Sequence, residues 1–194
     1  MSVILETERL IFRPLLIDDV DILFKIDSNP NIHEYLWKKP TTDINQTKFI
    51  INSIQGQYIK HKIGRYGIVL KETNELIGWG GLKFNENMVN NHTDFYDIGI
   101  CLDESQWNKK LGFEIFHTWV KYFFENMNLP KVYAYTQINN SGSNKLAERI
   151  GMRLKEDFFY ENENWNWYEM GLLTYQMLLK KGLLKDIELK ITNI

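Results

Sequence analysis

The sequence predicts a single mixed α/β domain with a central, mostly antiparallel, twisted sheet, one locally parallel strand pair and helices on both faces. Its 194 residues suffice for one domain with a sizeable core and are too few for two. Strand-like alternation and helix-like spacing of apolar residues follow one another along the chain. A long helical segment joins the fourth and fifth predicted strands, and a helical crossover of this kind favours a parallel pair.

The N-terminal half is predicted to contain four strands and two helices. Pro14 ends the first strand, and Asn29-Pro30 stops the first helix. The polar segment 72–75 lies between two apolar runs and indicates a hairpin. The elements are a strand at 10–13, a helix opened by Asp18 and Asp19, a helix capped by Thr42 or Asp43, and strands at about 67–70, 76–84 and 95–102.

The C-terminal half is predicted to contain the longest helix and three further strands. Phe116, Trp119 and Phe123 belong to the apolar stripe of that helix. A short helix opens at Asn140, and Gly151 lies just past its end, where glycine is common. The elements are helices at about 111–126 and 140–150 and strands at about 131–138, 153–160 and 165–175.

Composition excludes several classes of protein. The formal net charge is -2 and no long block of Lys and Arg occurs, so we expect no nucleic-acid partner. The N-terminus does not resemble a signal peptide and no apolar run approaches about 20 residues, so we expect no membrane association. Cys101 is the only cysteine, which favours a reducing, cytoplasmic compartment. No repeat or linker divides the chain, so residues 1–194 are expected to form one domain.

Five segments, in order and at consistent spacing, resemble the Gcn5-related N-acetyltransferase family. The resemblance is strongest to the subgroup of ribosomal-protein N-terminal (alanine or serine) acetyltransferases. It covers about residues 7–176 and leaves 177–194 as a C-terminal extension. The segments are TERLIFRP at 7–14, NPNIHEYL at 29–36, DIGICLDESQW at 97–107, NSGS at 140–143 and IGM at 150–152.

The resemblance implies an enzyme that transfers acetyl from acetyl-CoA to a primary amine by direct attack. A loop that opens a helix offers free N–H groups and a positive dipole end to the pyrophosphate. An exposed strand edge pairs with the pantetheine amides, and one of its N–H groups can hold the thioester oxygen. The expected cofactor-binding residues are Ile100, Cys101 and Leu102 on the strand, Trp107, Asn108, Lys109, Lys110, Leu111, Gly112 and Phe113 in the loop, and Asn140 and Ser143 beyond.

One position departs from the family pattern. The family's pyrophosphate loop is Q/R-x-x-G-x-G/A, and this chain reads Trp107-Asn108-Lys109-Lys110-Leu111-Gly112. Gly112 keeps the second glycine, while Lys110 replaces the first. The lysine either crowds the phosphates or contacts them through its ammonium group.

The resemblance also implies the catalytic residues. Ser143 matches the serine that protonates the departing thiolate in the subgroup; the tyrosine of the wider family is replaced by Ala147. Asp97 stands where the family often has the glutamate that deprotonates the amine, directly or through water. Asp157 and Glu161 are competing carboxylates, and Phe159 occupies the position of a base found in some subgroup members.

Each candidate also has a purely structural reading. Asn140 and Ser143 fit a helix cap, Asp97 a polar residue on the outer face of a strand, and Cys101 a small buried hydrophobe. The aromatic residues between 158 and 168 are core or, in part, a cation–π wall for a substrate ammonium. No metal is expected, because the four histidines, His33, His61, His92 and His117, lack ligand spacing.

Several alternatives remain open. The rival function is a catalytically degenerate module that binds acetyl-CoA without turnover. Within the enzyme reading, the acceptor is a protein N-terminus, a polyamine, an amino sugar or another small amine. The extension packs on its own domain or on the second subunit of a homodimer.

Overall fold

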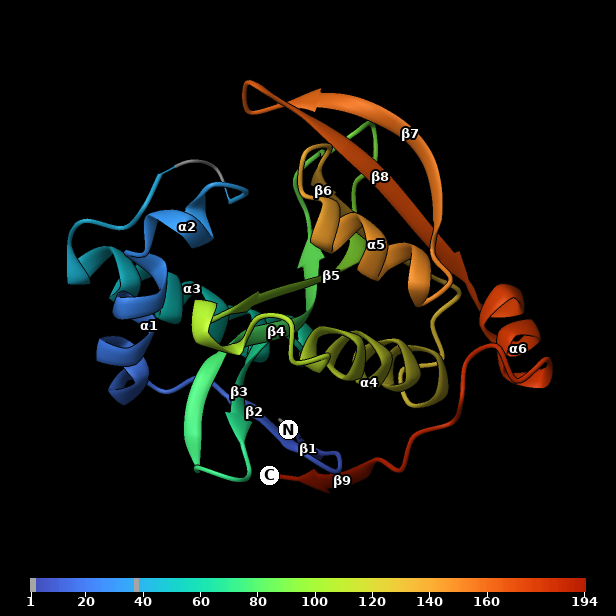
Figure 1. Ribbon diagram of the computed structural model, residues 1–194, viewed down its shortest axis with the longest axis horizontal. Helices are drawn as coiled ribbons and strands as arrows, with labels where there is room; N and C mark the ends of the chain where they lie inside the picture. The colour runs from blue at the N-terminus through green and yellow to red at the C-terminus, as the bar shows by residue number, and fades with distance from the viewer. Residues whose placement is uncertain (1–2, 37–38) are drawn as a thin grey trace.

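The computed structural model describes residues 3–36 and 39–194 and contains a nine-stranded sheet in the order β7-β8-β6-β5-β4-β3-β2-β1-β9 (Figure 1). The strands are β1 (Val3–Glu6), β2 (Leu10–Pro14), β3 (Arg65–Leu70), β4 (Glu75–Asn85), β5 (Phe95–Leu102), β6 (Lys131–Gln137), β7 (Arg153–Tyr160), β8 (Glu163–Gly171) and β9 (Lys190–Asn193). The α-helices are α1 (Val20–Asp27), α2 (Pro30–His33), α3 (Ile44–His61), α4 (Leu111–Glu125), α5 (Ser141–Arg149) and α6 (Leu172–Lys180). Two short 3-10 helices are η1 (Ile17–Asp19) and η2 (Glu104–Gln106).

The sheet has the mixed topology that the sequence predicts. Every neighbouring pair is antiparallel except β5 and β6, which are parallel. Helices α1 to α3 lie together at one side of the molecule, α4 crosses the centre, and α5 lies beside β6, β7 and β8 (Figure 1). The prediction of a mixed α/β fold with one parallel pair is therefore confirmed.

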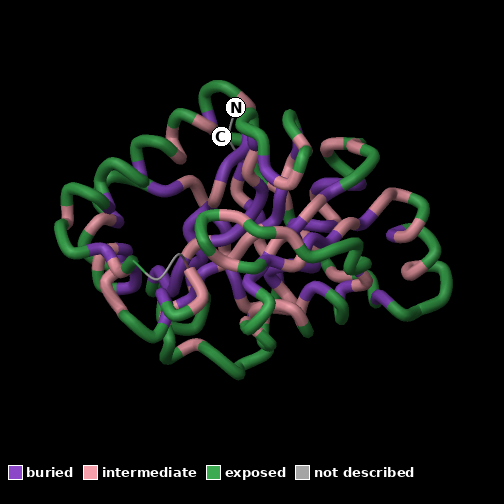
Figure 2. Tube along the Cα trace, turned by 90° about the horizontal axis from the view of Figure 1, so that it is seen from above, coloured by how far each residue is buried: buried purple, intermediate pink, exposed green. Residues whose placement is uncertain are grey.

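The main core lies between α4 and the central strands. Trp119, Val120 and Phe123 form the buried stripe of α4, and none of the three exposes surface to solvent. Tyr66 of β3 contacts the Trp119 ring with the centroids 5.0 Å apart. The tube in Figure 2 shows buried segments gathered at the centre and exposed segments around the periphery. The amphipathic pattern of residues 111–126 thus reflects their packing.

The C-terminal extension packs on its own domain. After α6 the chain returns along the molecule, and β9 pairs antiparallel with β1 at the edge of the sheet. Lys190 forms a 3.0 Å ion pair with Glu6, and Leu184 is buried in the main core. Of the two alternatives open for the extension, packing on the domain is the one that the structure contains.

One sequence prediction was wrong in detail, and another was correct but incomplete. The strand expected at 165–175 ends at Gly171, and residues from Leu172 are helical. Asn29-Pro30 does not only stop α1, because Asn29 accepts a hydrogen bond from the Asn31 N–H and caps α2, in which Pro30 is the first residue. Proline is well tolerated there because the first helical N–H has no partner within the helix.

Within residues 3–36 and 39–194, no helix is long and apolar enough to cross a membrane.

Candidate active site

A groove of about 1550 Å³ opens where β5 and β6 separate. The two strands pair only through Asp97 and Tyr133. Beyond this pair, residues 98–102 of β5 and 134–136 of β6 line opposite sides of the groove. One edge of β5 remains bound to β4 along its length, so the other edge faces the groove. The expected pantetheine positions Ile100, Cys101 and Leu102 all lie on this segment.

The loop at one end of the groove leads into the N-terminus of α4. Trp107, Asn108 and Lys110 line the groove, as do Leu111 and Gly112 of the first helical turn. The first N–H groups of a helix have no partner within it, so this end of α4 suits an anion. Lys109 is absent from the groove lining that includes its neighbours, and its ammonium group donates to the Gln106 side chain at 3.1 Å.

Lys110 adopts the left-handed backbone conformation, with φ 62° and ψ 13°, and is the N-cap of α4. Glycine adopts this conformation without the steric cost of a Cβ atom. The glycine at this place in the family's pattern thus has a conformational reason, and Lys110 keeps the conformation at an energetic cost. Arg9 fixes the loop backbone, because its guanidinium donates hydrogen bonds to the carbonyl oxygens of Lys109 at 3.1 Å and Lys110 at 3.5 Å.

Two further cations lie at this end of the groove and were not found by sequence reasoning. Lys145 and Arg149 are one helical turn apart on α5, and both line the groove with Lys110. The Arg149 guanidinium lies 4.8 Å from the centroid of the Phe113 ring. The i, i+4 spacing was visible in the sequence, but the approach of α5 to the α4 loop was not. This end of the groove is therefore positively charged.

Asn140 and Ser143 lie where α5 begins, beside β6. The Asn140 side chain accepts a hydrogen bond from the Ser143 N–H at 3.0 Å, which confirms the helix-cap reading of this pair. Ser143 is half-buried and lines the groove. The cap and the place in the groove are compatible, because the cap uses the backbone of Ser143 and leaves its hydroxyl group available.

Asn144 holds this segment and was not singled out from the sequence. Its amide nitrogen donates to the carbonyl oxygens of Gln137, Ile138 and Asn140 at 2.8–3.1 Å. Its amide oxygen accepts from Asn166 at 2.8 Å and from the Tyr168 hydroxyl at 2.9 Å. The β6–α5 connection is thereby fixed to β8, and with it the neighbouring Ser143.

Asp97 is buried on β5, so the reading of an outer-face polar residue was wrong. Its Oδ2 accepts from the Arg65 guanidinium, and its Oδ1 accepts from the Asn85 amide at 2.6 Å. Arg65 also donates to the Asp97 carbonyl oxygen at 3.1 Å and lies 5.8 Å from the Trp79 ring centroid. Both carboxylate oxygens thus hold a donor already. Asp97 anchors Arg65 in the groove, and its role as a base stays a prediction.

Lys83 lies opposite Asp97 on β4 and lines the same part of the groove. Burial lowers the pKa of its ammonium group, while the charges of Asp97 and Glu161 oppose that shift. Glu161 is an exposed residue of the β7–β8 turn and also lines the groove. The other competing carboxylate, Asp157, is exposed on β7 and does not line the groove.

Asp27, the last residue of α1, is a buried carboxylate that sequence reasoning missed. It is 7% exposed and lines the groove on the side of α1 to α3. Burial raises the pKa of this carboxyl group to about 6, and the Trp79 side chain, as hydrogen-bond partner, partly offsets the shift. A carboxylate with a pKa near neutrality inside a groove is a common feature of functional sites.

The other candidates have structural roles. Cys101 is buried against Ile26 and Ile32, and burial raises the pKa of its thiol, as expected for an inert hydrophobe. His117 is buried on α4 with its ring against Phe113. Most of the aromatic residues between 158 and 168 pack as core, although Trp165 also lines the groove. In the described parts of the chain, no three His, Cys, Asp or Glu residues gather as metal ligands do.

The comparison with known proteins settles the family. Residues 9–153 match the family model of the acetyltransferase (GNAT) domain. The chain belongs to the GNAT family. It is 30% identical over 149 residues to an uncharacterized N-acetyltransferase, p20, of Bacillus licheniformis, and the match covers 77% of this chain and 82% of p20. As a family member, the chain is an acetyl-CoA-dependent acyltransferase.

Two solved GNAT structures share the fold at lower sequence identity. A spermidine N-acetyltransferase from Vibrio cholerae, in complex with CoA and spermine, is 18% identical with a TM-score of 0.70, over 86% of this chain and 98% of that one. A ribosomal L7/L12 α-N-protein acetyltransferase in complex with coenzyme A is 16% identical with a TM-score of 0.70, over 86% of this chain and 96% of that one. These neighbours act on different amines, so the shared fold leaves the acceptor open.

Proposed function

We propose that this protein transfers the acetyl group of acetyl-CoA to a primary amine by direct attack within the groove between β5 and β6. The observation that supports this most strongly is the charge and edge pattern along one groove. The groove contains the cations Lys110, Lys145 and Arg149, the open edge of β5, and the carboxylates Asp27 and Asp97. A phosphate-bearing arm needs cations, and an ammonium group needs a carboxylate.

In this proposal the α4 N-terminus and the three cations bind the phosphates of acetyl-CoA, and the edge of β5 binds the pantetheine amides. A backbone N–H group on that edge, at residues 100–102, stabilises negative charge on the thioester oxygen. The charge of Lys110 is then useful, because each of these phosphates is an anion. Asn140 and Ser143 lie beside the reacting end of the arm.

The reaction needs no acetyl-enzyme. The neutral amine attacks the thioester carbon, the C–N bond forms, and the C–S bond breaks with the electron pair on sulfur. The nitrogen releases one proton to solvent as the amide forms, and the Ser143 hydroxyl passes a proton to the thiolate as it takes one from solvent. Cys101 takes no part as a nucleophile, because its thiol is buried and burial raises the thiol pKa.

The rival function, a degenerate acetyl-CoA-binding module, predicts binding without turnover. Calorimetry with acetyl-CoA tests the binding that both functions share, and a thiol reagent then follows CoA release in the presence of amines. Amine-dependent CoA release with an acetamide product supports the enzyme. The module is favoured if acetyl-CoA binds tightly but no CoA is released when N-terminal peptides, spermidine, glucosamine or 2-phenylethylamine are added.

A further inference from the structure

Asp27 stands apart from the other carboxylates that line the groove. Among the described lining residues these carboxylates are Asp27, Asp97, Glu161 and Glu163. Asp97 is paired with Arg65, the charge of Glu161 acts on Lys83, and Glu163 has an interaction of its own. Among the described residues, no cation appears among the influences on Asp27, which are burial and the Trp79 side chain. None of the described side chains therefore neutralises its negative charge.

In the part of the chain that the structure describes, no cation of the elements packed around Asp27 forms an ion pair with it, and Lys39 is exposed. From α2, His33 faces this region, and burial lowers the pKa of its imidazole, so the ring is neutral at neutral pH. From β4 and β5 come Trp79 and the buried thiol of Cys101, whose pKa the Asp27 charge helps to raise. From residues 39–41, the Thr41 N–H donates to the Asp27 carbonyl oxygen at 2.8 Å. Since no described side chain pairs a cation with Asp27, its carboxylate is open to the ammonium group of a ligand.

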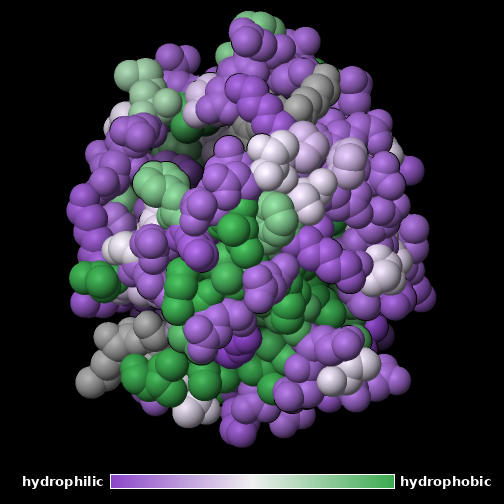
Figure 3. All heavy atoms as spheres, turned by 90° about the vertical axis from the view of Figure 1, so that its left-hand side faces the viewer, coloured by the Kyte–Doolittle hydropathy of each residue, from purple (hydrophilic) through white to green (hydrophobic). Residues whose placement is uncertain are grey.

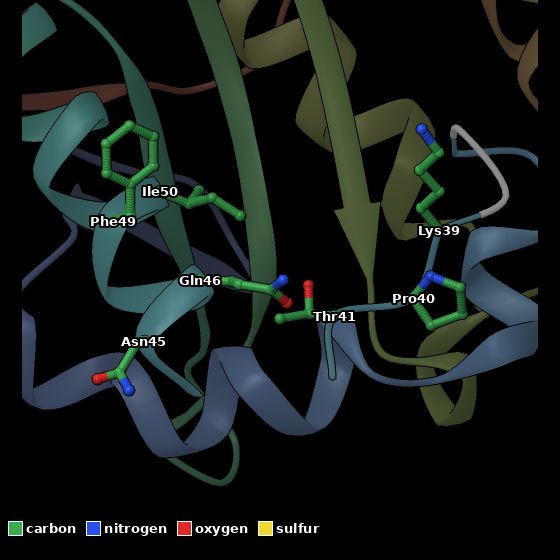
Figure 4. A pocket seen from close by; sticks show the side chains of 7 residues that line it. All are labelled: Lys39, Pro40, Thr41, Asn45, Gln46, Phe49 and Ile50. Atoms are coloured by element: carbon green, nitrogen blue, oxygen red, sulfur yellow. The ribbon is translucent and has the colours of Figure 1, made fainter. Parts of the chain in front are cut away.

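The walls near Asp27 contain many apolar residues beside the polar His33, Thr41 and Ser53. Ile32 and Leu36 lie on and after α2, Trp79 lies on β4, and Ile50 and Ile54 lie on α3; all five line the groove. A smaller pocket of about 510 Å³ adjoins the groove and shares Lys39, Thr41, Phe49 and Ile50 with it. Figure 4 shows Phe49 and Ile50 on α3, with Lys39 and Pro40 across the pocket from them. Figure 3, viewed from the side of α1 to α3, shows a broad hydrophobic area on this face.

Two basic residues that line the groove, Lys83 and Lys39, disfavour an acceptor with a second ammonium group. Lys83 is half-buried without an ion pair among the described residues, and Lys39 is exposed at the rim. A polyamine that placed one ammonium at Asp27 would bring its other charges toward these lysines or against apolar walls. The part of the groove around Asp27 therefore suits a ligand with one positive charge and an apolar body.

From this arrangement we infer that the acceptor is a monoamine with an apolar body, whose ammonium group binds Asp27 and gives up its proton to the Asp27 carboxylate. The inference rests on the proposed acetyl transfer. The ammonium transfers one proton to Asp27, and the nitrogen lone pair then attacks the thioester carbon. Asp27 releases the proton to solvent through the open groove, and the nitrogen releases its second proton to solvent as the amide forms.

Asp27→Asn keeps the size and the hydrogen-bond acceptor of the side chain and removes the charge. With 2-phenylethylamine as the probe, we expect kcat/KM to fall by about 100-fold, within the range for a general base. The wild-type profile of kcat/KM should rise with pH through a midpoint near 6, and this limb should be absent in the variant. Asp21→Asn is the matched control, because Asp21 is an exposed carboxylate on the same helix. The wild type should also prefer 2-phenylethylamine to spermidine.

Two measurements separate the inference from the proposed function. Calorimetry of acetyl-CoA should give the same Kd for wild type and Asp27→Asn. NMR titration of 2-phenylethylamine into the CoA complex should show binding to the wild type and at least tenfold weaker binding to the variant. Unchanged kinetics and amine binding in Asp27→Asn, or a preference for spermidine, would overturn the inference and leave acetyl transfer standing. A wild type that binds acetyl-CoA but acetylates no amine would overturn the proposed function, and the inference with it.

Discussion

Replacing Lys110 with glycine separates the conformational cost of this residue from its contact with the cofactor. The φ of 62° at Lys110 lies in the left-handed region, which costs a residue with a side chain about 1 kcal/mol relative to glycine. Lys110→Gly should therefore stabilise the free protein by about 1 kcal/mol, which for a domain of this size corresponds to a rise in Tm of about 2–4 °C. Differential scanning calorimetry without ligand measures this directly.

The same variant should bind acetyl-CoA less tightly. If the Lys110 ammonium contacts a phosphate, its loss should cost about 1 kcal/mol, or a fivefold increase in Kd. Lys110→Ala is the control, because it removes the charge and keeps a Cβ atom in the left-handed conformation. Both variants should bind more weakly and with less salt dependence than the wild type, since exposed charge pairs are screened over about 8 Å at physiological ionic strength.

Two results would each refute one part of this reasoning. Tighter acetyl-CoA binding by Lys110→Gly than by the wild type, with unchanged salt dependence, means that Lys110 only obstructs the loop. An unchanged or lower Tm of the free glycine variant would contradict the conformational part. The two parts are therefore tested by different measurements on the same pair of proteins.

Three further predictions concern the rest of the site and the core. Ser143→Ala should lower kcat by more than tenfold with little change in acetyl-CoA affinity, and a loss below about threefold in steady-state assays would leave Ser143 only its structural role. Asn144→Ala removes a side chain with five hydrogen bonds, four of them part-buried, and should destabilise the protein by about 2 kcal/mol in urea unfolding, since the partners lose their bonds; unchanged stability would contradict this. Burial lowers the pKa of His117 from 6.5 to about 4 in the folded state, so stability present above pH 6.5 should fall by about 3 kcal/mol as the pH drops toward 4. His117→Phe should lose less stability over that interval, and equal losses in both proteins would contradict the assignment.

The elements that the sequence predicted well carry local signals. Helix α5 follows directly from Asn140, whose side chain caps it, and α4 follows from the spacing of Trp119 and Phe123. Strand β9 was missed because its partner, β1, lies more than 180 residues away in the sequence. The segment after Gly171 was predicted as a strand, because its apolar residues fit a strand as well as a helix. In the structure it forms α6 and packs beside β8.

In the candidate site, too, local features were predicted from the sequence and features that depend on distant residues were missed. The cofactor loop and the edge of β5 were predicted because each is a contiguous segment. Arg65 and Asp97 are 32 residues apart, and their ion pair depends on the register of three strands. Asp27 reads in the sequence as an ordinary polar residue at a helix end. Its burial against Trp79 and Cys101 becomes visible only when α1 is placed on the sheet.

The central claim is that the groove between β5 and β6 carries out acetyl transfer to an amine. The most direct test follows CoA release by the purified protein with acetyl-CoA and 2-phenylethylamine, and quantifies the acetamide by mass spectrometry. The account predicts amine-dependent release with one acetamide formed for each CoA. Acetyl-CoA bound with no acetamide from this amine, from spermidine or from peptide N-termini would contradict it.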